Sequence, residues 1–296
     1  MNEKVYAYKN KAVFFGGLFV RAKKSEYVIR KKVLAVLLMI ALLFLLVAVF
    51  LQEKRKYALH DRLVETETFR EMHVTEELLD KITELQKQSG LSKGRLLALT
   101  FAGTKASFPG RVPTLEQLER TAEWVYRYRP REYELLENGF CAVWNDLECF
   151  PVKCQVSYED SWMAERNYGG KRGHEGTDLM PPVNQNGFYP IYSITAGTIE
   201  HMGWLEKGGW RIGIRSGHGG YFYYAHLSDY AKGLEEGKTV EAGEMLGYMG
   251  DSGYGKEGTT GQFAVHLHFG IYIQTADGRE VSVNPYWILK SLETEH

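Results

Sequence analysis

The longest pattern along the chain is an unbroken apolar run from Val33 to Leu51, which contains no charged or strongly polar side chain. Basic residues precede it at positions 30–32, and a stretch of mixed charge follows it at positions 53–56. At a helical rise of about 1.5 Å per residue the run reaches roughly 28 Å, close to the thickness of the hydrocarbon core of a bilayer. The pattern predicts a transmembrane helix over residues 33–51.

A cleaved signal peptide and a buried core helix are the two alternatives to this anchor. The apolar run is longer than the core of a signal peptide, which usually has about 7 to 15 residues, and no small-x-small cleavage site follows Phe50-Leu51-Gln52-Glu53. A buried helix of a soluble protein is rarely apolar on every face. The sequence therefore favours an anchor that stays attached.

Lys and Arg dominate the segment before this helix. The positive-inside rule counts these residues near the membrane, so residues 1–32 are expected to be cytoplasmic and everything after Gln52 extracytoplasmic. The basic side chains are Lys4, Lys9, Lys11, Arg21, Lys23, Lys24, Arg30, Lys31 and Lys32, opposed by Glu3 and Glu26. The prediction is a single-pass cell-membrane protein with its functional part outside.

From residue 52 to residue 140 the pattern is mainly helical, with apolar side chains three or four positions apart. We expect one helix that starts near Thr75 and ends at Gly90, a second over Ser92–Phe101, and a third from Thr114 to Tyr128 that Pro130 closes. Three roles stay open for this region: a spacer, an interaction module for an envelope protein, or a reduced lysozyme-like domain. Its Glu residues lie at ordinary solvent-face positions, so no glycosidase carboxylate pair is predicted.

After Cys154 the helical periodicity disappears, Gly becomes frequent, and short runs of Ile, Val, Tyr and Phe alternate with turns. This texture predicts a mainly β domain with an antiparallel sheet over residues 141–296. The candidate strands are Ile191–Ile199, Trp210–Ser216, Gly219–His226, Met245–Met249 and His266–Ile273.

The composition of the chain says little about which molecules it binds. Its 296 residues carry a formal net charge of -1, so nothing favours nucleic acid as a partner. The three cysteines, Cys141, Cys149 and Cys154, allow one disulfide outside the cytoplasm, but free buried thiols fit the sequence equally well.

Histidines and one aspartate in the β-rich half form the candidate chemistry. His174 and Asp178 lie four positions apart, and His266 and His268 lie two apart. Residues i and i+2 of a strand point to the same face, so the two imidazoles of the pair are expected to share one pocket. His226, near the end of a predicted strand, is a further candidate. No histidine or aspartate lies two or four positions from the other histidines, which are His60, His73, His201, His218 and His296.

This set matches a zinc site. A catalytic zinc takes three protein ligands and keeps one position for water, so four candidates exceed the need by one. The surplus indicates that one histidine lies beside the metal as a catalytic residue. Each motif alone also arises by chance, and only their combination is specific.

With these motifs in place, the chain from about Phe150 to Leu289 resembles the lysostaphin-like (LytM-type) zinc endopeptidases of peptidoglycan. The matching elements are His174 to Asp178, the Tyr-Ala-His-Leu stretch at His226, the Gly-rich region Gly247–Gly255, His-Leu-His-Phe at 266–269, and Val283-Asn284-Pro285. The resemblance covers nearly half of the chain.

The resemblance implies one zinc ion per chain, bound by His174, Asp178 and His268, with His226 and His266 as catalytic histidines. Tyr168 lies where some members of the family carry a tyrosine that stabilises the oxyanion. Arg166 is either a substrate contact or structural, and Glu175 is expected to face away from His174 and to be non-catalytic.

These implications predict a membrane-anchored zinc metalloendopeptidase that hydrolyses peptide bonds of peptidoglycan cross-links or stem peptides. The alternative is a catalytically silent scaffold or regulator of the same fold that binds envelope proteins or peptidoglycan. The complete set of predicted ligands favours the enzyme. Two segments, Met202–Gly209 and Asp251–Gly261, are expected to be pocket loops that set bond specificity, which the sequence leaves open.

Overall fold

The computed structural model describes residues 3–54, 59–108, 113–168 and 170–293, with the backbone alone for 3–26 and 53–54. The chain forms two compact units, Met1–Lys56 and Tyr57–His296. Residues 1 and 2 of the predicted basic segment lie outside the described residues.

The first unit is one helix, α1 (Glu3–Lys54). The helix predicted over 33–51 lies within it, but the helical backbone begins well before residue 33, because the preceding segment has only two glycines and no proline to break it. Its stretch Tyr27–Gln52 is long and apolar enough to cross a membrane and has 0% of its surface buried in the molecule. A signal sequence has the same properties.

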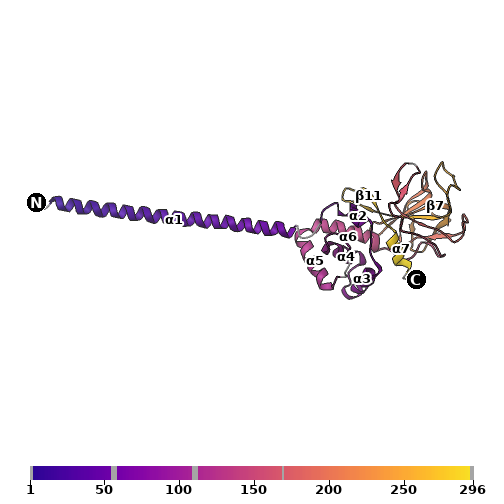
Figure 1. Ribbon diagram of the computed structural model, residues 1–296, viewed down its shortest axis with the longest axis horizontal. Coiled ribbons are helices and arrows are strands. Elements are labelled where there is room, and N and C mark those ends of the chain that lie inside the picture. Colours follow the sequence, from indigo (N-terminus) through magenta and orange to yellow (C-terminus); the bar gives the residue numbers. More distant parts are fainter. Residues whose placement is uncertain (1–2, 55–58, 109–112, 169, 294–296) are drawn as a thin grey trace. The chain divides into compact units, whose positions relative to one another are not determined.

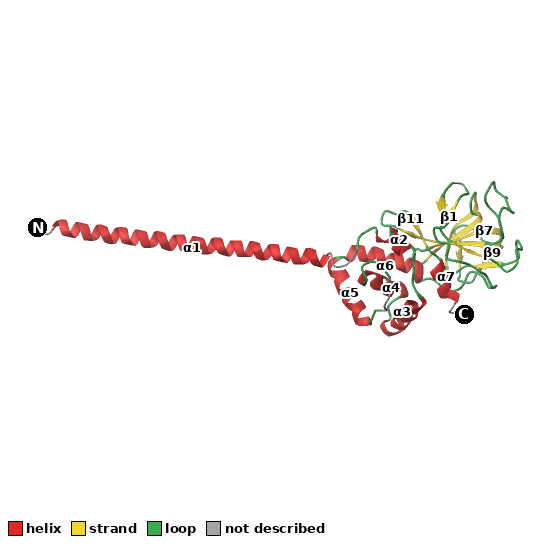
Figure 2. Ribbon diagram, viewed as in Figure 1, coloured by secondary structure: helices red, strands yellow, loops and turns green. Residues whose placement is uncertain are grey.

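The second unit begins with helices, which gather on one side of it, and continues into strands (Figures 1 and 2). The helices are η1 (Leu63–Glu65, a 3-10 turn), α2 (Glu67–Arg70), α3 (Glu76–Ser89), α4 (Lys93–Gly103), α5 (Leu115–Tyr128), α6 (Pro130–Trp144) and, at the C-terminal end, α7 (Tyr286–Glu293).

The three predicted helices are present as α3, α4 and α5, and their ends have local causes. The side chains of Thr75, Ser92 and Thr114 each accept a hydrogen bond from a backbone N–H of the first turn, which satisfies a donor that the helix cannot. Gly90 ends α3 in the left-handed conformation, with φ of 70°.

Pro130 was expected only to close α5, yet it also begins α6 at the first helical position. Proline suits that position because its missing N–H would have no partner there. Tyr133, Leu136 and Phe140 are fully buried at helical spacing, a signal that the sequence contains and that our prediction missed. The short helix α7 was missed as well.

In the described part of the chain, eleven strands follow the helices of this region. They are β1 (Glu165–Arg166), β2 (Arg172–Gly173), β3 (Thr177–Leu179), β4 (Pro190–Tyr192), β5 (Gly197–Leu205), β6 (Gly209–Ser216), β7 (Tyr221–Tyr230), β8 (Thr239–Val240), β9 (Met245–Met249), β10 (Leu267–Gln274) and β11 (Glu280–Val283). All their pairings are antiparallel, which confirms the predicted sheet.

The main sheet has nine strands in the order β11-β10-β7-β6-β5-β8, with β3 beside β10 and with β9 joining β4 to β7. β1 and β2 form a separate ribbon. The predicted strand 191–199 is in fact two, β4 and β5, which occupy different places in the sheet. Residues 202–205 of the predicted pocket loop belong to β5, so only the turn to β6 remains as loop.

Helix α6 joins the helical region to the sheet. Gly139 allows this approach, because a Cβ there would lie 2.9 Å from Val64 Cγ1 and 3.4 Å from Ile273 Cδ1 of β10. The border predicted between residues 140 and 141 falls inside α6 and inside one compact unit. The division into a helical region and a peptidase domain stays a prediction. All three cysteines are free thiols.

Candidate active site

One face of the sheet carries the predicted site residues. In the register of β3, β10 and β7, Asp178 lies opposite His268, and His268 lies opposite Ala225. The alternating neighbours Leu267 and Phe269 are buried on the other face. The two-residue period of the strand therefore puts the polar side chains on one side and the core on the other.

His174, Asp178 and His268 meet at one point, although 90 residues separate Asp178 from His268. His174 Nε2 lies 3.1 Å from Asp178 Oδ1 and 3.0 Å from His268 Nδ1. His268 Nδ1 lies 2.9 Å from the same Asp178 oxygen. Gly176 makes room for this cluster, since a Cβ there would lie 2.4 Å from the His268 ring.

These distances fit a single small cation. Donors on a tetrahedral zinc, each at about 2.0–2.1 Å from the ion, would lie roughly 3.3 Å apart. Two imidazole nitrogens and one carboxylate oxygen are also the ligand types that zinc takes. Among the described residues this is the one group of three such side chains close enough to hold a metal. That these residues bind zinc stays a prediction.

Two neighbours compete for the second nitrogen of His174. Ser161 Oγ lies 2.9 Å from Nδ1 and can accept its proton, whereas Arg166 Nη2 lies 3.1 Å away and can only donate. Arg166 also donates to Asp178 Oδ2 at 2.7 Å. A metal on Nε2 requires the proton on Nδ1, so the contact with Ser161 is the one that supports metal binding.

The shifted pKa values of Asp178 and His268 favour the protonation states that bind a cation. Burial raises the pKa of Asp178, but hydrogen bonds from His174 and His268 outweigh it and hold the pKa well below its usual range. Burial lowers the pKa of His268, although Asp178 opposes this shift. Asp178 is therefore a carboxylate and His268 a neutral imidazole, the protonation states that a metal needs.

His226 and His266 flank this cluster with their ring nitrogens fixed. His226 Nδ1 lies 2.7 Å from the Ser252 carbonyl oxygen, and His266 Nδ1 lies 2.7 Å from that of Ala264. A carbonyl only accepts, so each Nδ1 carries a proton, and in the neutral form of each ring the lone pair is on Nε2. The two ring centroids are 4.8 Å apart.

The position of His226 depends on an irregular backbone. It lies inside β7, not at its end as predicted, and its φ is +63°. The pairing of β7 with β6 shifts register at this point, which is a β-bulge. Burial lowers the pKa of His226 well below its ordinary value, and the charges of His266 and His268 lower it further. His226 is therefore neutral near neutral pH.

Tyr168, the sixth predicted site residue, does not line the cavity that contains the other five. Its ring stacks on Tyr254, with 4.2 Å between centroids. Tyr254 does line the cavity, and Phe263 contacts the His226 ring at 4.6 Å between centroids. Both lie in or near the segment 251–261 that was expected to shape the pocket. Glu175 borders the cavity and forms an ion pair with Arg70 of α2, at 3.4 Å.

The cavity, of about 510 Å³, extends from the histidines over a tyrosine floor that sequence reasoning missed. Tyr221, Tyr223 and Tyr272 form this floor, with centroids 6.1–6.3 Å apart. Glycines leave the space that two of these tyrosines occupy. A Cβ on Gly213 would lie 1.8 Å from Tyr221 Oη, and one on Gly208 would lie 2.2 Å from Tyr223 Oη. The available signal was the two-residue spacing of Tyr221 and Tyr223.

Sequence comparison places this region among peptidases. The pattern of Peptidase family M23 matches residues 172–285. The L-Ala--D-Glu endopeptidase of Bacillus subtilis (strain 168) is 43% identical over 144 residues, which is 48% of this chain and 42% of that protein. Lysostaphin of Staphylococcus simulans is 33% identical over 98 residues, 32% of this chain and 17% of that protein. The matches thus span less than half of these relatives.

A solved structure matches far more of the chain. It is of a LytM-type protein from Ruminococcus gnavus ATCC 29149, 44% identical, and the alignment covers 79% of this chain and 94% of that one, with a TM-score of 0.68. Coverage of 79% requires that helical residues before the sheet take part in the match. On the strength of this fold, this coverage and the matching motif region, the chain belongs to Peptidase family M23.

Proposed function

We propose that this protein is a membrane-anchored zinc endopeptidase that hydrolyses peptide bonds in peptidoglycan cross-links or stem peptides. One observation carries the proposal: a His174–Asp178–His268 cluster of metal-binding geometry lies beside two histidines, His226 and His266, whose Nδ1 atoms are held by backbone carbonyls. An inactive scaffold of the same fold has no need for this combination.

Zinc would be held by His174 Nε2, Asp178 Oδ1 and His268 Nδ1. When bound, it supplies a Lewis acid that polarises the scissile carbonyl and lowers the pKa of water. Asp178 supplies the negative charge of the ligand set, and Arg166 orients that carboxylate through its other oxygen.

His226 and His266 would move the protons. In the neutral ring Nε2 is an acceptor, so one histidine can take a proton from the attacking water. The other, in its protonated form, can stabilise the charge of the tetrahedral intermediate and pass its Nε2 proton to the departing amine. The carbonyls of Ser252 and Ala264 keep both rings oriented through the step. Tyr168 is proposed as a further, outer contact of the substrate.

The names of the relatives support the proposed substrate class. One is named for the L-Ala–D-Glu bond, and another is lysostaphin. The open cavity, which continues past the histidines for several side chains, suits an extended peptide. The apolar stretch Tyr27–Gln52 would anchor the enzyme, with residues after 52 outside the membrane. The helices before the sheet remain candidates for contact with an envelope protein.

The decisive experiment uses the full chain in detergent, loaded with zinc, on purified peptidoglycan, with mass spectrometry of the released fragments. Wild type is expected to separate peptides at one type of bond. Asp178→Asn removes a ligand charge and His226→Asn a proton acceptor, and each should lower the rate by about 10²-fold or more.

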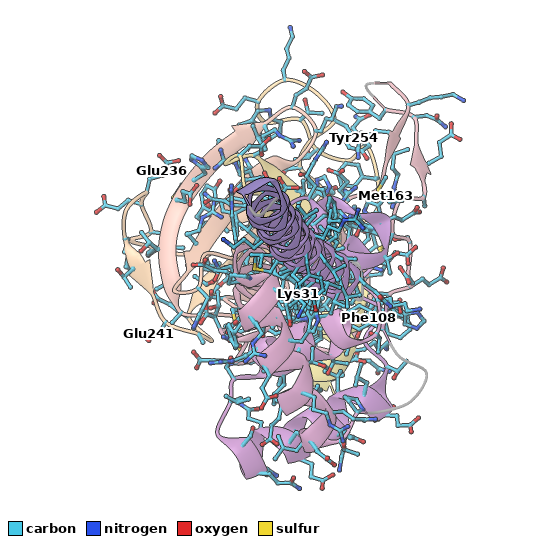
Figure 3. The ribbon with its side chains drawn as sticks, turned by 90° about the vertical axis from the view of Figure 1, so that its left-hand side faces the viewer. Lys31, Phe108, Met163, Glu236, Glu241 and Tyr254 are labelled. Carbon is cyan, nitrogen blue, oxygen red and sulfur yellow. The ribbon has the colours of Figure 1, made fainter. Side chains whose placement is uncertain are left out.

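Glu241→Gln is the matched control for Asp178→Asn. It also turns a carboxylate into a carboxamide, but Glu241 is exposed and lies apart from Tyr254 at the border of the site (Figure 3). Its activity should equal wild type. Intact peptidoglycan after incubation with folded, zinc-loaded wild type would instead support the scaffold.

A further inference from the structure

Two arginines that line the cavity each have a buried guanidinium nitrogen with no hydrogen-bond acceptor among the described residues. Arg211 of β6 and Arg172 of β2 both line it, and Arg211 Nη1 and Arg172 Nε are buried without a hydrogen-bond acceptor in the described part of the chain. No ion pair forms with either guanidinium among those residues. A buried donor without a partner is costly, so such a group in a cavity indicates that a ligand completes it.

The acidic groups of the same cavity are already engaged. Glu280 pairs with Arg215, and Glu175 pairs with Arg70. The third cavity arginine, Arg166, pairs with Asp178. Arg172 and Arg211 are therefore the cavity arginines whose charge the described residues leave uncompensated.

The tyrosine floor adds neutral donors to the cavity that these two cations line. Burial raises the pKa of Tyr221 to about 12 and also raises those of Tyr223 and Tyr272, so all three keep their hydroxyl protons at neutral pH. The positive charge of Arg211 opposes the rise at Tyr221 and Tyr223, which places the guanidinium within electrostatic reach of both.

The register relates Arg211 to the proposed metal site. β6 pairs with β7 so that Arg211 falls opposite the bulge at Ala225 and His226, and Ala225 in turn lies opposite His268. Arg211 is thus two strands from His268, about 10 Å at roughly 4.8 Å per strand. A long guanidinium side chain covers part of that distance, so it can reach a group one or two residues from the bond that is cut.

We propose that Arg211 and Arg172, above the tyrosine floor, form a carboxylate-binding subsite that selects peptides with a free carboxylate beside the scissile bond. The inference rests on the proposed peptidase function and names its substrate class. A planar guanidinium binds a carboxylate through two parallel hydrogen bonds, which a lysine cannot reproduce. A glutamyl residue next to the bond, as in the name of the Bacillus relative, carries such a carboxylate whichever of its carboxyls continues the chain.

The test uses two peptides with an L-Ala–D-Glu bond, one with the free carboxylate of D-Glu and one with a carboxamide in its place. The zinc-loaded full chain in detergent is expected to cut the carboxylate peptide with a kcat/KM roughly 10- to 100-fold higher, because the carboxamide leaves the guanidinium unpaired. Arg211→Gln and Arg172→Gln should each reduce this preference and leave the slow hydrolysis of the carboxamide peptide within about threefold of wild type.

Two variants separate a specific contact from general charge and from misfolding. Arg211→Lys keeps the charge and should still lose most of the preference, because the ammonium lacks the planar pair of donors. Lys171→Gln removes one positive charge next to Arg172 in sequence, but Lys171 is exposed and pairs with Glu165, so it should keep the preference. Thermal melting of each variant shows that it is folded.

Equal cleavage of the two peptides by wild type, or an unchanged preference in Arg211→Gln, would overturn the subsite and leave the peptidase function standing. If wild type cuts neither peptide, calorimetric binding of both decides: tighter binding of the carboxylate peptide that Arg211→Gln abolishes supports the subsite although this bond is not the one cut. Equal or undetectable binding overturns it.

Discussion

At the scale of single residues, the positions of ring protons decide what each histidine can do. His226 and His266 present Nε2 to the site because their Nδ1–H groups donate to backbone carbonyls. His174 differs, since its Nδ1 faces both a hydroxyl and a guanidinium. Asn284 reaches the same region by donating to Asp160, the residue before Ser161. This asymmetry makes Ser161 a positioning residue for the metal site.

Ser161→Ala is therefore expected to weaken zinc binding by roughly 10- to 100-fold, as loss of a hydrogen-bond partner behind a metal-bound histidine commonly does. Competition with a chromophoric chelator measures the affinity. Ser89→Ala, which removes a hydroxyl from the end of α3, serves as control. An unchanged affinity in Ser161→Ala would show that Ser161 does not set the protonation of His174.

At the scale of elements, η1 and α2 form hydrogen bonds and an ion pair with β11 and the residues on either side of it. Arg70 donates to the carbonyl oxygen and to the hydroxyl of Ser282, both at 2.8 Å, and its own carbonyl accepts from Asn284 N. Glu65 of η1 accepts from Arg279, just before β11, at 2.9 Å. Because Arg70 also meets Glu175, next to His174, these contacts link the helices to the proposed site.

The Glu65 contact predicts a pH-dependent stability. Hydrogen bonds from Arg62 and Arg279 lower the pKa of Glu65 to about 2. A carboxyl with a lowered folded-state pKa stabilises the fold above its ordinary pKa, and this contribution is lost as the pH falls from about 5 towards 2. Glu65→Gln should therefore lower the melting temperature at pH 7 and have a smaller effect near pH 2.5.

Melting curves of the full chain in detergent at both pH values measure this effect. Glu241→Gln, at an exposed carboxylate outside these contacts, should leave the curves unchanged. An equal loss in Glu65→Gln at both pH values would show that packing, and not the ionised carboxylate, accounts for the contribution.

At the scale of the whole molecule, the apolar stretch Tyr27–Gln52 of α1 has side chains that its own unit leaves exposed. Phe44, for example, is 71% exposed. Burial of apolar surface is worth about 25 cal/mol per Å², so a helix of this kind is stable only where lipid or another apolar surface surrounds it. A membrane anchor and a signal sequence both place this helix in lipid. An anchor stays attached to the mature protein, whereas a signal sequence is cleaved off.

An anchor predicts that the protein stays in the membrane fraction through high-salt and alkaline washes. Protease added to the outside of spheroplasts should remove everything after about residue 52 and leave a short protected N-terminal fragment. N-terminal sequencing of the mature protein gives the contrary outcome: a soluble chain that begins near residue 52 would identify the helix as a cleaved signal. Full protection from the protease would reverse the predicted orientation.

Sequence alone predicted what depends on local spacing. Helices repeat every 3.6 residues and strands every 2 residues, so both can be read from neighbouring positions in the sequence. This reading predicted the apolar helix, the shared face of the His-x-His pair, and the helices that begin after Thr75, Ser92 and Thr114. The family resemblance then joined His174 and Asp178 to His268, and the structure places these side chains within reach of one ion. Their role as ligands stays a prediction.

Only the tertiary structure decided what depends on strand order and register. It showed that residues 191–199 divide between two strands at different places in the sheet, and that Tyr221, Tyr223 and Tyr272 form one floor. It also brought Arg172 and Arg211 to the same cavity. The physical reason is that hydrogen bonds between strands far apart in the chain fix which side chains become neighbours, and no local pattern encodes that choice.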